Sequence, residues 1–199
     1  MPLSPGDKLG PYEILAPLGA GGMGEVYRAR DPRLNRHVAI KVSQERFSDC
    51  FEREARAVAA LNHPNICQLY DVGPNYLVME LVEGEALAAR LRRGALKLEQ
   101  AVAVAIQIAD ALAEAHGKGV VHRDLKPANI MLGKSGAKVL DFGLAKIEQR
   151  VTDQQETITI TAQGAILGTV QYMSPEQAQG KQTDARRGTT SAGDITSYR

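Results

Sequence analysis

The sequence predicts an α+β protein in which a lobe built on a five-stranded antiparallel sheet precedes a helical lobe. Short runs with the alternating pattern of strands fill two regions, Tyr12 to Val42 and Ile66 to Leu81, and turns rich in Gly, Pro and Asn separate them. Farther along, Leu98 to Gly117 carries apolar residues at helical spacing. Strands gathered in one part of a chain and helices in another are typical of α+β folds.

The first strands flank a glycine-rich turn, Gly19-Ala20-Gly21-Gly22-Met23-Gly24. Dinucleotide-binding folds share this spacing, but there a helix begins at the last glycine and an acidic residue closes the next strand. Here Glu25 to Arg30 alternates like a strand, and the next strand ends in Lys41. We therefore expect a β-hairpin whose glycines let backbone amides approach phosphates closely. A glycine-rich turn without a ligand is the alternative.

Lys41 follows three small or branched apolar residues, Val38-Ala39-Ile40, that would lie inside the sheet. A lysine in that setting needs an anion, such as a phosphate or a carboxylate, to balance its charge. A helix is expected next, because one apolar face repeats at i, i+3, i+4, i+7 and i+10 through Phe51, Glu54, Ala55, Val58 and Leu61. Glu54 on that face is the expected partner of Lys41. An ordinary position at the flank of the helix is the alternative for Glu54.

Most of the candidate chemistry lies in His122-Arg123-Asp124-Leu125-Lys126-Pro127-Ala128-Asn129 and in Asp141-Phe142-Gly143. Asp124 can accept a proton from an attacking hydroxyl, and Lys126 can balance charge on a transferring phosphate. Asn129 and Asp141 supply the hard oxygen ligands that suit Mg²⁺. Phosphoryl transfer needs this set of groups. The alternative is a polar hairpin whose carboxylates cap turns.

These two motifs resemble the catalytic loop and the magnesium loop of protein kinases, and a lysine two residues after the aspartate resembles the serine/threonine branch. With the glycine-rich hairpin and Lys41, the chain is similar to bacterial serine/threonine protein kinases of the eukaryotic-like family, truncated at the C-terminus. The resemblance implies a protein-kinase-like bilobal fold, with helix C beside the sheet and an incomplete helical C-lobe. It implies ATP and Mg²⁺ as cofactors. It also implies four catalytic residues and two metal ligands: Asp124, Lys126, Lys41 and Glu54, then Asn129 and Asp141. His122 is a packed structural histidine in this family.

The resemblance also implies where the nucleotide binds. Met79 to Gly84 resembles the hinge between kinase lobes, with Met79 as gatekeeper and the backbones of Glu80 and Val82 as partners of adenine. The residues expected to line the nucleotide are Leu18, Gly19, Ala20, Gly21, Gly22, Met23, Gly24, Glu25, Val26, Ala39, Lys41, Glu80, Val82 and Met131.

Residues Leu144 to Tyr172 form a long segment, rich in Thr, Gln and Glu, that resembles a kinase activation segment. A phosphate on it would add a charge of about −1.5 to −2 and could pair with Arg123. Thr161 is the first candidate for that phosphorylation and Thr159 the second, with an unmodified loop as the alternative. Thr169 lies in a Gly-Thr pair that resembles the substrate-docking turn.

The motifs divide the chain into a lead-in (1–11), a kinase domain (12–186) and a polar tail (187–199). Within the domain we expect an N-lobe (12–79), a hinge (80–84) and a partial C-lobe (85–186). The tail has no helical stripe and few apolar residues. The alternative function is therefore a truncated, catalytically defective fragment that at most binds nucleotide. The expected core face of the long helix is Val102, Ala105, Ile106, Ala109, Leu112, Ala113 and His116.

The composition, with 44% hydrophobic and 24% charged residues, is that of an ordinary globular protein. A formal net charge of +1 gives no support to nucleic acid or an anionic membrane as the main partner. Two cysteines are too few for a disulfide scaffold, so we expect a cytoplasmic protein. Neither a signal peptide nor a transmembrane segment is visible. The expected partners are protein substrates with Ser or Thr, and the resemblance also admits a kinase–kinase contact for trans-autophosphorylation.

Overall fold

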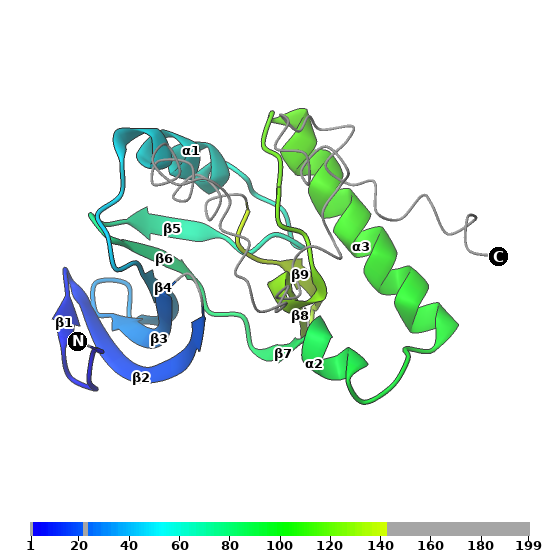
Figure 1. The fold of residues 1–199 in the computed structure, drawn as a ribbon, viewed down its shortest axis with the longest axis horizontal. Helices are drawn as coiled ribbons and strands as arrows, with labels where there is room; N and C mark the ends of the chain where they lie inside the picture. Colours follow the sequence, from blue (N-terminus) through cyan, green and yellow to red (C-terminus); the bar gives the residue numbers. More distant parts are fainter. Residues whose placement is uncertain (1, 22–23, 143–199) are drawn as a thin grey trace, which may run out of the picture.

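A computed structural model of the chain describes residues 2–21 and 24–142, which form two lobes joined by a short connection (Figure 1). The first lobe holds an antiparallel sheet with the strand order β1-β2-β3-β4-β6-β5. These strands are β1 Lys8–Leu9, β2 Tyr12–Gly21, β3 Gly24–Asp31, β4 Arg36–Val42, β5 Leu69–Val72 and β6 Tyr76–Glu80. The expected α+β fold is confirmed, with the sheet in the first lobe.

The sheet differs from the expectation in two places. A two-residue strand, β1, pairs with the start of β2, so the sheet has six strands among the described residues instead of five. The strand expected from Ile66 begins only at Leu69. Ile66 leaves the sheet because it forms a parallel bridge with Val139 of the second lobe. The glycine-rich turn joins β2 and β3 as a hairpin, with Gly21 opposite Gly24, and no helix begins at Gly24.

One helix, α1 (Asp49–Ala59), packs against β5. The hydroxyl of Ser48 caps its first turn by accepting a hydrogen bond from the Phe51 amide at 3.2 Å. The buried residues of α1 are Phe51, Ala55 and Val58, as the helical spacing predicts. Glu54 lies at the edge of that face, with 39% of its side chain exposed. The helix therefore presents its apolar face to the sheet and Glu54 to the border between the lobes.

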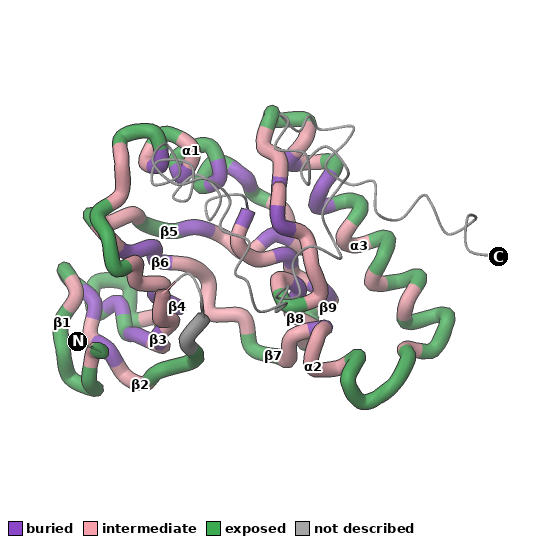
Figure 2. Tube along the Cα trace, viewed as in Figure 1, coloured by how far each residue is buried: buried purple, intermediate pink, exposed green. Residues whose placement is uncertain are grey.

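Two hydrophobic clusters fill the two sides of the sheet. On one side, Tyr12, Ile14, Tyr27, Ala29, Val38, Ile40, Tyr76 and Val78 are buried together. The other cluster joins α1 and β6 to the second lobe through Phe51, Ala55, Val58, Leu61, Ile66, Leu69, Leu77, Ala111, Leu112, Ala115, Val139 and Phe142. Buried positions accordingly occur on the sheet, on α1, on the segment that carries Val139 and Phe142, and at one end of α3, whereas the connection between β6 and β7 is half-buried or exposed (Figure 2). Packing between the lobes thus belongs to the main core.

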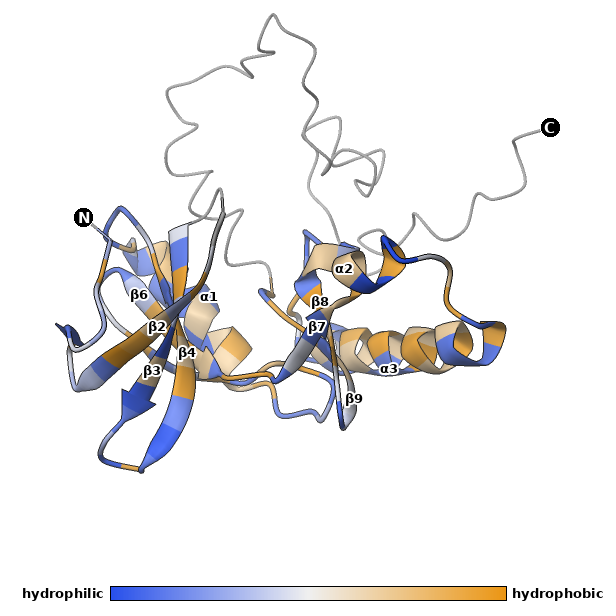
Figure 3. Ribbon diagram, turned by 90° about the horizontal axis from the view of Figure 1, so that it is seen from below, coloured by the Kyte–Doolittle hydropathy of each residue, from blue (hydrophilic) through white to orange (hydrophobic). Residues whose placement is uncertain are grey.

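The second lobe begins directly after the connection. Its elements are β7 Gly84–Ala86, α2 Leu87–Leu91, α3 Leu98–Gly117, the 3₁₀ turn η1 Pro127–Asn129, β8 Ile130–Gly133 and β9 Gly136–Val139. The three strands form a small antiparallel sheet in the order β7-β8-β9, and α3 packs against β9. Seen from below, this lobe lies beside the first, with α3 pointing away from the large sheet (Figure 3). The helix α3 has the bounds that the sequence predicts.

The expected core face of α3 is wrong for most of its residues. Ala111, Leu112 and Ala115 are the buried positions, with Val104 and Ile108 partly buried. Val102 and Ile106 are 49% and 56% exposed. The helix touches the rest of the described chain near its C-terminal end and along β9, so the first half of the expected stripe has no described element over it. Of the expected residues only Leu112 is buried.

None of the helices within residues 2–21 and 24–142 has both the length and the apolar character that a membrane crossing requires.

Candidate active site

The acidic centre of the candidate site is Asp124, which lies between α3 and η1 and is only 7% exposed. Its carboxylate oxygen Oδ2 accepts a hydrogen bond from the Asn129 amide at 3.1 Å and forms an ion pair with the Lys126 ammonium at 2.8 Å. Asn129 also donates to the Asp124 carbonyl at 2.9 Å. The turn η1 begins with Pro127, whose fixed φ suits the first position of a helical turn, and brings Asn129 back towards Asp124. Three of the predicted residues therefore form one cluster.

A buried histidine, His122, packs against the loop that carries Asp124. His122 is 2% exposed, its Nε2 donates to the Leu140 carbonyl at 2.8 Å, and its Nδ1 accepts from the Asp124 amide at 3.3 Å. Its ring also contacts the ring of Phe142 in a tilted arrangement, with centroids 4.8 Å apart. Burial lowers the pKa of His122, so the imidazole stays neutral and keeps both hydrogen bonds. His122 is thus a packed residue, as expected, that links the Asp124 loop to the segment carrying Asp141.

The lysine of the sheet meets a carboxylate, but it is not the one that helical spacing indicated. The Lys41 ammonium lies 3.0 Å from Oδ2 of Asp141, and the Lys41 side chain is 15% exposed. Glu54 instead pairs with Arg123, with 3.2 Å between Oε2 and Nη1. The expected pair of Lys41 with Glu54 is therefore not formed in this structure. Periodicity places a residue on a face of a helix, but the position of α1 relative to β4 and the loops decides which cation it meets.

Two residues of the candidate site have left-handed backbones. Arg123 has φ 61° and Asp141 has φ 54°, and neither is glycine. A side chain in this region strains the backbone, and such residues gather at functional sites where the surroundings hold them in place. Here the His122 contacts on both sides hold the two loops. Arg123 and Asp141 lie beside the Asp124 cluster, and their charged groups contact Glu54 and Lys41 respectively.

The predicted nucleotide-lining residues lie mainly on the large sheet and the connection. Val26 is opposite Lys41 in the β3–β4 register, and Ala39 is opposite Met79 in the β4–β6 register. Gly24 has φ 106°, and a side chain there would collide with the carbonyl of Val42, so only glycine fits. Leu18 is half exposed. Met131 lies on β8 of the second lobe, where it pairs with Ala86.

Within the connection, Glu80 closes β6 and Val82 precedes β7. The Glu80 amide donates to the Gln68 carbonyl at 2.9 Å. Gly19, Ala20, Gly21 and Glu25 belong to the β2–β3 hairpin. Gly22, Met23, Thr159, Thr161, Thr169 and the segment from 143 onwards lie outside the described residues.

Asn129 and Asp141 fit the donor set of a Mg²⁺ site. Because the Asn129 amide nitrogen donates to Asp124, the amide oxygen is left to accept, and Asp141 supplies a carboxylate. Among the described residues no group of three or more His, Cys, Asp and Glu side chains is placed to hold a metal ion. An ion at this position would therefore take its other ligands from phosphate oxygens and water, as Mg²⁺ commonly does.

Sequence reasoning missed Lys138 on β9. Its ammonium lies 2.8 Å from Oε2 of Glu80, so it reaches the connection between the lobes from the strand that leads to Asp141. The sequence signal for such a residue was a lysine in a short strand whose other residues, Gly136, Ala137 and Val139, are small or apolar. A lysine in such a strand needs an anionic partner. Nothing in the local pattern identified Glu80 as that partner.

Comparisons with known proteins agree with this geometry. The family described as protein kinase domain matches residues 12–197. The chain is 44% identical over 200 residues to a probable serine/threonine-protein kinase of Streptomyces coelicolor, and 42% identical over 198 residues to the serine/threonine-protein kinase PknB of Mycobacterium tuberculosis. Each alignment covers 92% of this chain, but only 29% and 31% of the relatives. The chain thus spans less than a third of the length of these relatives.

A solved structure is similar over almost the whole chain. The crystal structure of the C20A mutant of the PknI kinase domain of Mycobacterium tuberculosis gives a TM-score of 0.73 at 28% identity, covering 94% of this chain and 72% of that one. The two lobes, the cluster around Asp124 and the family match lead to the same conclusion: the chain belongs to the protein kinase family.

Proposed function

We propose that this chain transfers the γ-phosphoryl group of Mg-ATP to serine and threonine hydroxyls of proteins. The observation that carries the proposal is the Asp124 cluster, in which a nearly buried carboxylate is fixed by Asn129 and accompanied by the Lys126 ammonium. The serine/threonine-protein kinases to which the chain is similar support the choice of acceptor. Because the chain covers only part of those relatives, its own activity requires a direct test.

The residues of the cluster have separate roles in this reaction. Asp124 accepts the hydrogen bond, and finally the proton, of the acceptor hydroxyl, and Asn129 restricts its carboxylate to one orientation. Lys126 places a positive charge beside the oxygen where negative charge develops. Mg²⁺, when bound by Asn129 and Asp141, neutralises charge on the phosphate oxygens. Most of the rate enhancement would come from this positioning and from the fixed charges.

The ion pairs of the structure also indicate what must change when nucleotide binds. Lys41 is the expected partner of the α- and β-phosphates, but its ammonium now contacts Asp141. Nucleotide with Mg²⁺ would separate the two, because phosphates attract Lys41 and the metal ion attracts Asp141. Glu54, which pairs with Arg123, would then be the carboxylate that orients Lys41.

The finer assignments are part of the same proposal. Thr161, or else Thr159, would be phosphorylated and would then compete with Glu54 for Arg123, since a phosphate is the stronger anion. Thr169 would contact the acceptor peptide. Both cysteines of the chain, Cys50 and Cys67, are free thiols, which suits a reducing cytoplasm.

Phosphate transfer from isotopically labelled ATP to a Ser/Thr protein substrate, and to the chain itself, tests the proposal. Mg-ADP binding is measured in parallel by calorimetry. We expect Mg-dependent transfer to Ser and Thr that Asp141→Ala abolishes. Mg-ADP binding without any transfer would overturn the proposal and favour a nucleotide-binding fragment. Transfer to Tyr alone would overturn the assignment of the acceptor.

A further inference from the structure

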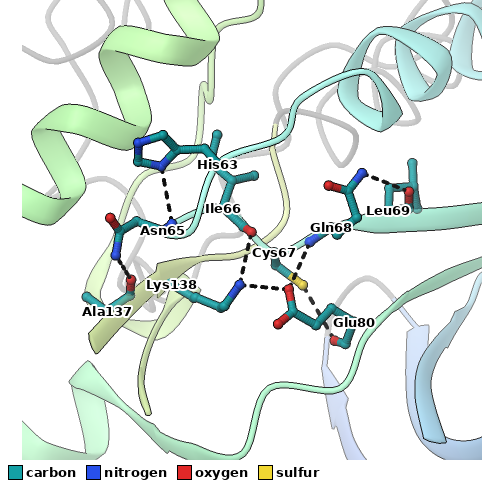
Figure 4. Close-up of polar contacts among 9 residues, drawn as sticks. All are labelled: His63, Asn65, Ile66, Cys67, Gln68, Leu69, Glu80, Ala137 and Lys138. Carbon is teal, nitrogen blue, oxygen red and sulfur yellow. Dashed lines mark hydrogen bonds and ion pairs between the residues drawn. The ribbon is translucent and has the colours of Figure 1, made fainter. Parts of the chain in front are cut away.

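Glu80, the last residue of β6, is held by two other segments of the chain at once (Figure 4). Its carboxylate oxygen Oε2 lies 2.8 Å from the Lys138 ammonium and accepts from the Gln68 amide at 3.3 Å. Its own amide donates to the Gln68 carbonyl at 2.9 Å. The Lys138 ammonium also donates to the Ile66 carbonyl at 3.4 Å. The side chain of Glu80 therefore connects the loop after α1 with the second lobe.

The loop between these partners is itself bonded to β9. The Val139 amide donates to the Asn65 carbonyl at 2.8 Å, and the Cys67 amide donates to the Val139 carbonyl at 2.9 Å. The Asn65 side chain adds a bond to the Ala137 carbonyl at 2.7 Å. Residues 65–67 thus lie along β9 like an additional short strand. Because β9 ends two residues before Asp141, movement of this loop would also displace the metal end of the site.

The environment favours a lasting contact between Lys138 and Glu80. Only 15% of the Lys138 side chain and 26% of the Glu80 side chain are exposed. Each charge would lose its main counter-charge if the other were removed, and unpaired charges with little solvent are unfavourable. The Cys67 thiol lies beside the pair, 3.6 Å from the Glu80 carbonyl. Burial, helped by the charge of Glu80, raises the pKa of Cys67 to about 12, so this neighbour adds no second negative charge.

We propose that Lys138 and Glu80 form a positioning pair that fixes the adenine-binding connection relative to Asp141. The inference rests on the proposed function, with the metal ion at Asp141 and with adenine at the backbone of Glu80, as the resemblance to kinases implies. A nucleotide then touches both ends of the site at once. If the two ends are held at a fixed separation, binding at one end presents the other part of the nucleotide at a high effective concentration. Preorganisation of this kind raises affinity without any new contact.

This role predicts which ligands respond to loss of the pair. Adenosine uses only the adenine end, whereas Mg-ADP uses both ends. Lys138→Met should weaken Mg-ADP binding by about three- to tenfold and leave adenosine binding within about twofold. Glu80→Gln should also weaken Mg-ADP binding, and the double variant should bind Mg-ADP no more weakly than either single variant, because both remove the same interaction. Lys138→Arg keeps a cation within reach of Glu80 and should restore most of the affinity.

The chain offers a matched control on its surface. Lys118, the C-cap residue of α3, pairs with Glu114 at 2.8 Å and also donates to the Ala60 carbonyl, so it has the same kinds of partner as Lys138. It is more exposed than Lys138 and, within the part of the chain that the structure describes, forms no hydrogen bond or ion pair with Glu80 or β9. Lys118→Met should change neither the affinity for adenosine nor the affinity for Mg-ADP. Calorimetric titration of the five variants and the unmodified chain with adenosine and with Mg-ADP is the test, and far-UV circular dichroism confirms that each variant is folded.

Each other outcome decides against the inference in a different way. Equal weakening of adenosine and Mg-ADP binding by Lys138→Met would assign the pair a general structural role. Unchanged Mg-ADP binding by these variants would mean that the pair does not position the two ends of the site. Tighter binding would mean that the pair holds the two ends in an arrangement that opposes nucleotide binding. If the losses of Mg-ADP affinity in the two single variants add up in the double variant, the two residues act independently and not as a pair. An unmodified chain that binds neither ligand would overturn the proposed function, and the inference with it.

Discussion

Asp124 has little freedom in this structure because two side chains make three contacts with it. The Asn129 amide bonds both its carbonyl and its carboxylate, and the Lys126 ammonium lies on the same carboxylate oxygen. Such restriction suits a group that must meet a hydroxyl in one geometry.

Replacing this carboxylate should separate catalysis from nucleotide binding. Asp124→Asn keeps the shape and an acceptor oxygen but removes the base, so we expect phosphate transfer to fall by about 10²- to 10⁴-fold. Mg-ADP affinity should stay within about twofold, since Asp124 is not an expected nucleotide contact. Initial-rate kinetics and calorimetry measure the two quantities. Full activity in Asp124→Asn would refute the role of this residue.

His122 should make the fold sensitive to mild acid. Its folded pKa lies below the usual 6.5 because of burial, so below about pH 6.5 the unfolded chain takes up a proton that the folded chain does not. The free energy of unfolding should therefore fall as the pH drops from about 7 towards about 5. Urea unfolding followed by circular dichroism measures this slope, since the chain has no Trp.

The control for this slope is His122→Gln, whose amide can still donate towards the Leu140 carbonyl. It should be less stable at neutral pH, with a smaller loss on acidification. His116, whose pKa burial also lowers, is present in both proteins, so the difference between the slopes isolates His122. Identical slopes would contradict the prediction.

Among the elements, α1 depends on a single side chain for its first turn. Ser48 accepts from the Phe51 amide, which would otherwise lack an intrahelical partner. Ser48→Ala should lower the free energy of unfolding by about 0.5 to 2 kcal/mol, whereas Ser48→Asp, which can also cap a helix, should lower it much less. Urea unfolding of both variants provides the comparison. Equal losses of unfolding free energy in the two variants would mean that the Ser48 hydroxyl does not stabilise the helix by capping its first turn.

The β2–β3 hairpin contains a matched pair of glycines. Gly24 has φ 106° and a side chain there would collide with the Val42 carbonyl, whereas a side chain at Gly19 meets nothing within 4 Å. Gly24→Ala should therefore destabilise the fold by at least about 1 kcal/mol, and Gly19→Ala by no more than about 0.5 kcal/mol. Thermal unfolding without ligand gives both values. A smaller effect at Gly24 than at Gly19 would argue against this hairpin geometry.

For the molecule as a whole, the shared core between α1, β6 and α3 should hold the lobes together. Leu112 of α3 is 7% exposed and belongs to the same cluster as Phe51 and Leu77. Leu112→Ala should lower the free energy of unfolding by about 2 to 5 kcal/mol through the cavity it leaves. Ile106→Ala, at a 56% exposed position of the same helix, should change it by less than about 1 kcal/mol. Similar losses, measured by urea unfolding, would show that the stripe predicted from the sequence is buried after all.

Much of the fold and part of the site followed from local sequence. Alternation predicted the strands, and helical spacing predicted α3 from Leu98 to Gly117, because the two periods are local properties of the backbone. The glycine-rich turn was correctly placed in a hairpin because the residues after it alternate. The cluster of Asp124, Lys126 and Asn129 was also predictable, since the three lie within six residues of chain around a single turn.

The tertiary structure alone decided which charges meet. Lys41 contacts Asp141, 100 residues away along the chain, and Glu54 contacts Arg123, 69 residues away. The pair of Lys138 with Glu80 and the exposure of Val102 and Ile106 on α3 likewise depend on how the lobes pack. A periodic pattern specifies the faces of an element, but Coulomb attraction and burial act between elements whose distances no local pattern contains. The sequence by itself therefore determined the chemical groups and the family, and the packing of the two lobes determined how those groups are paired.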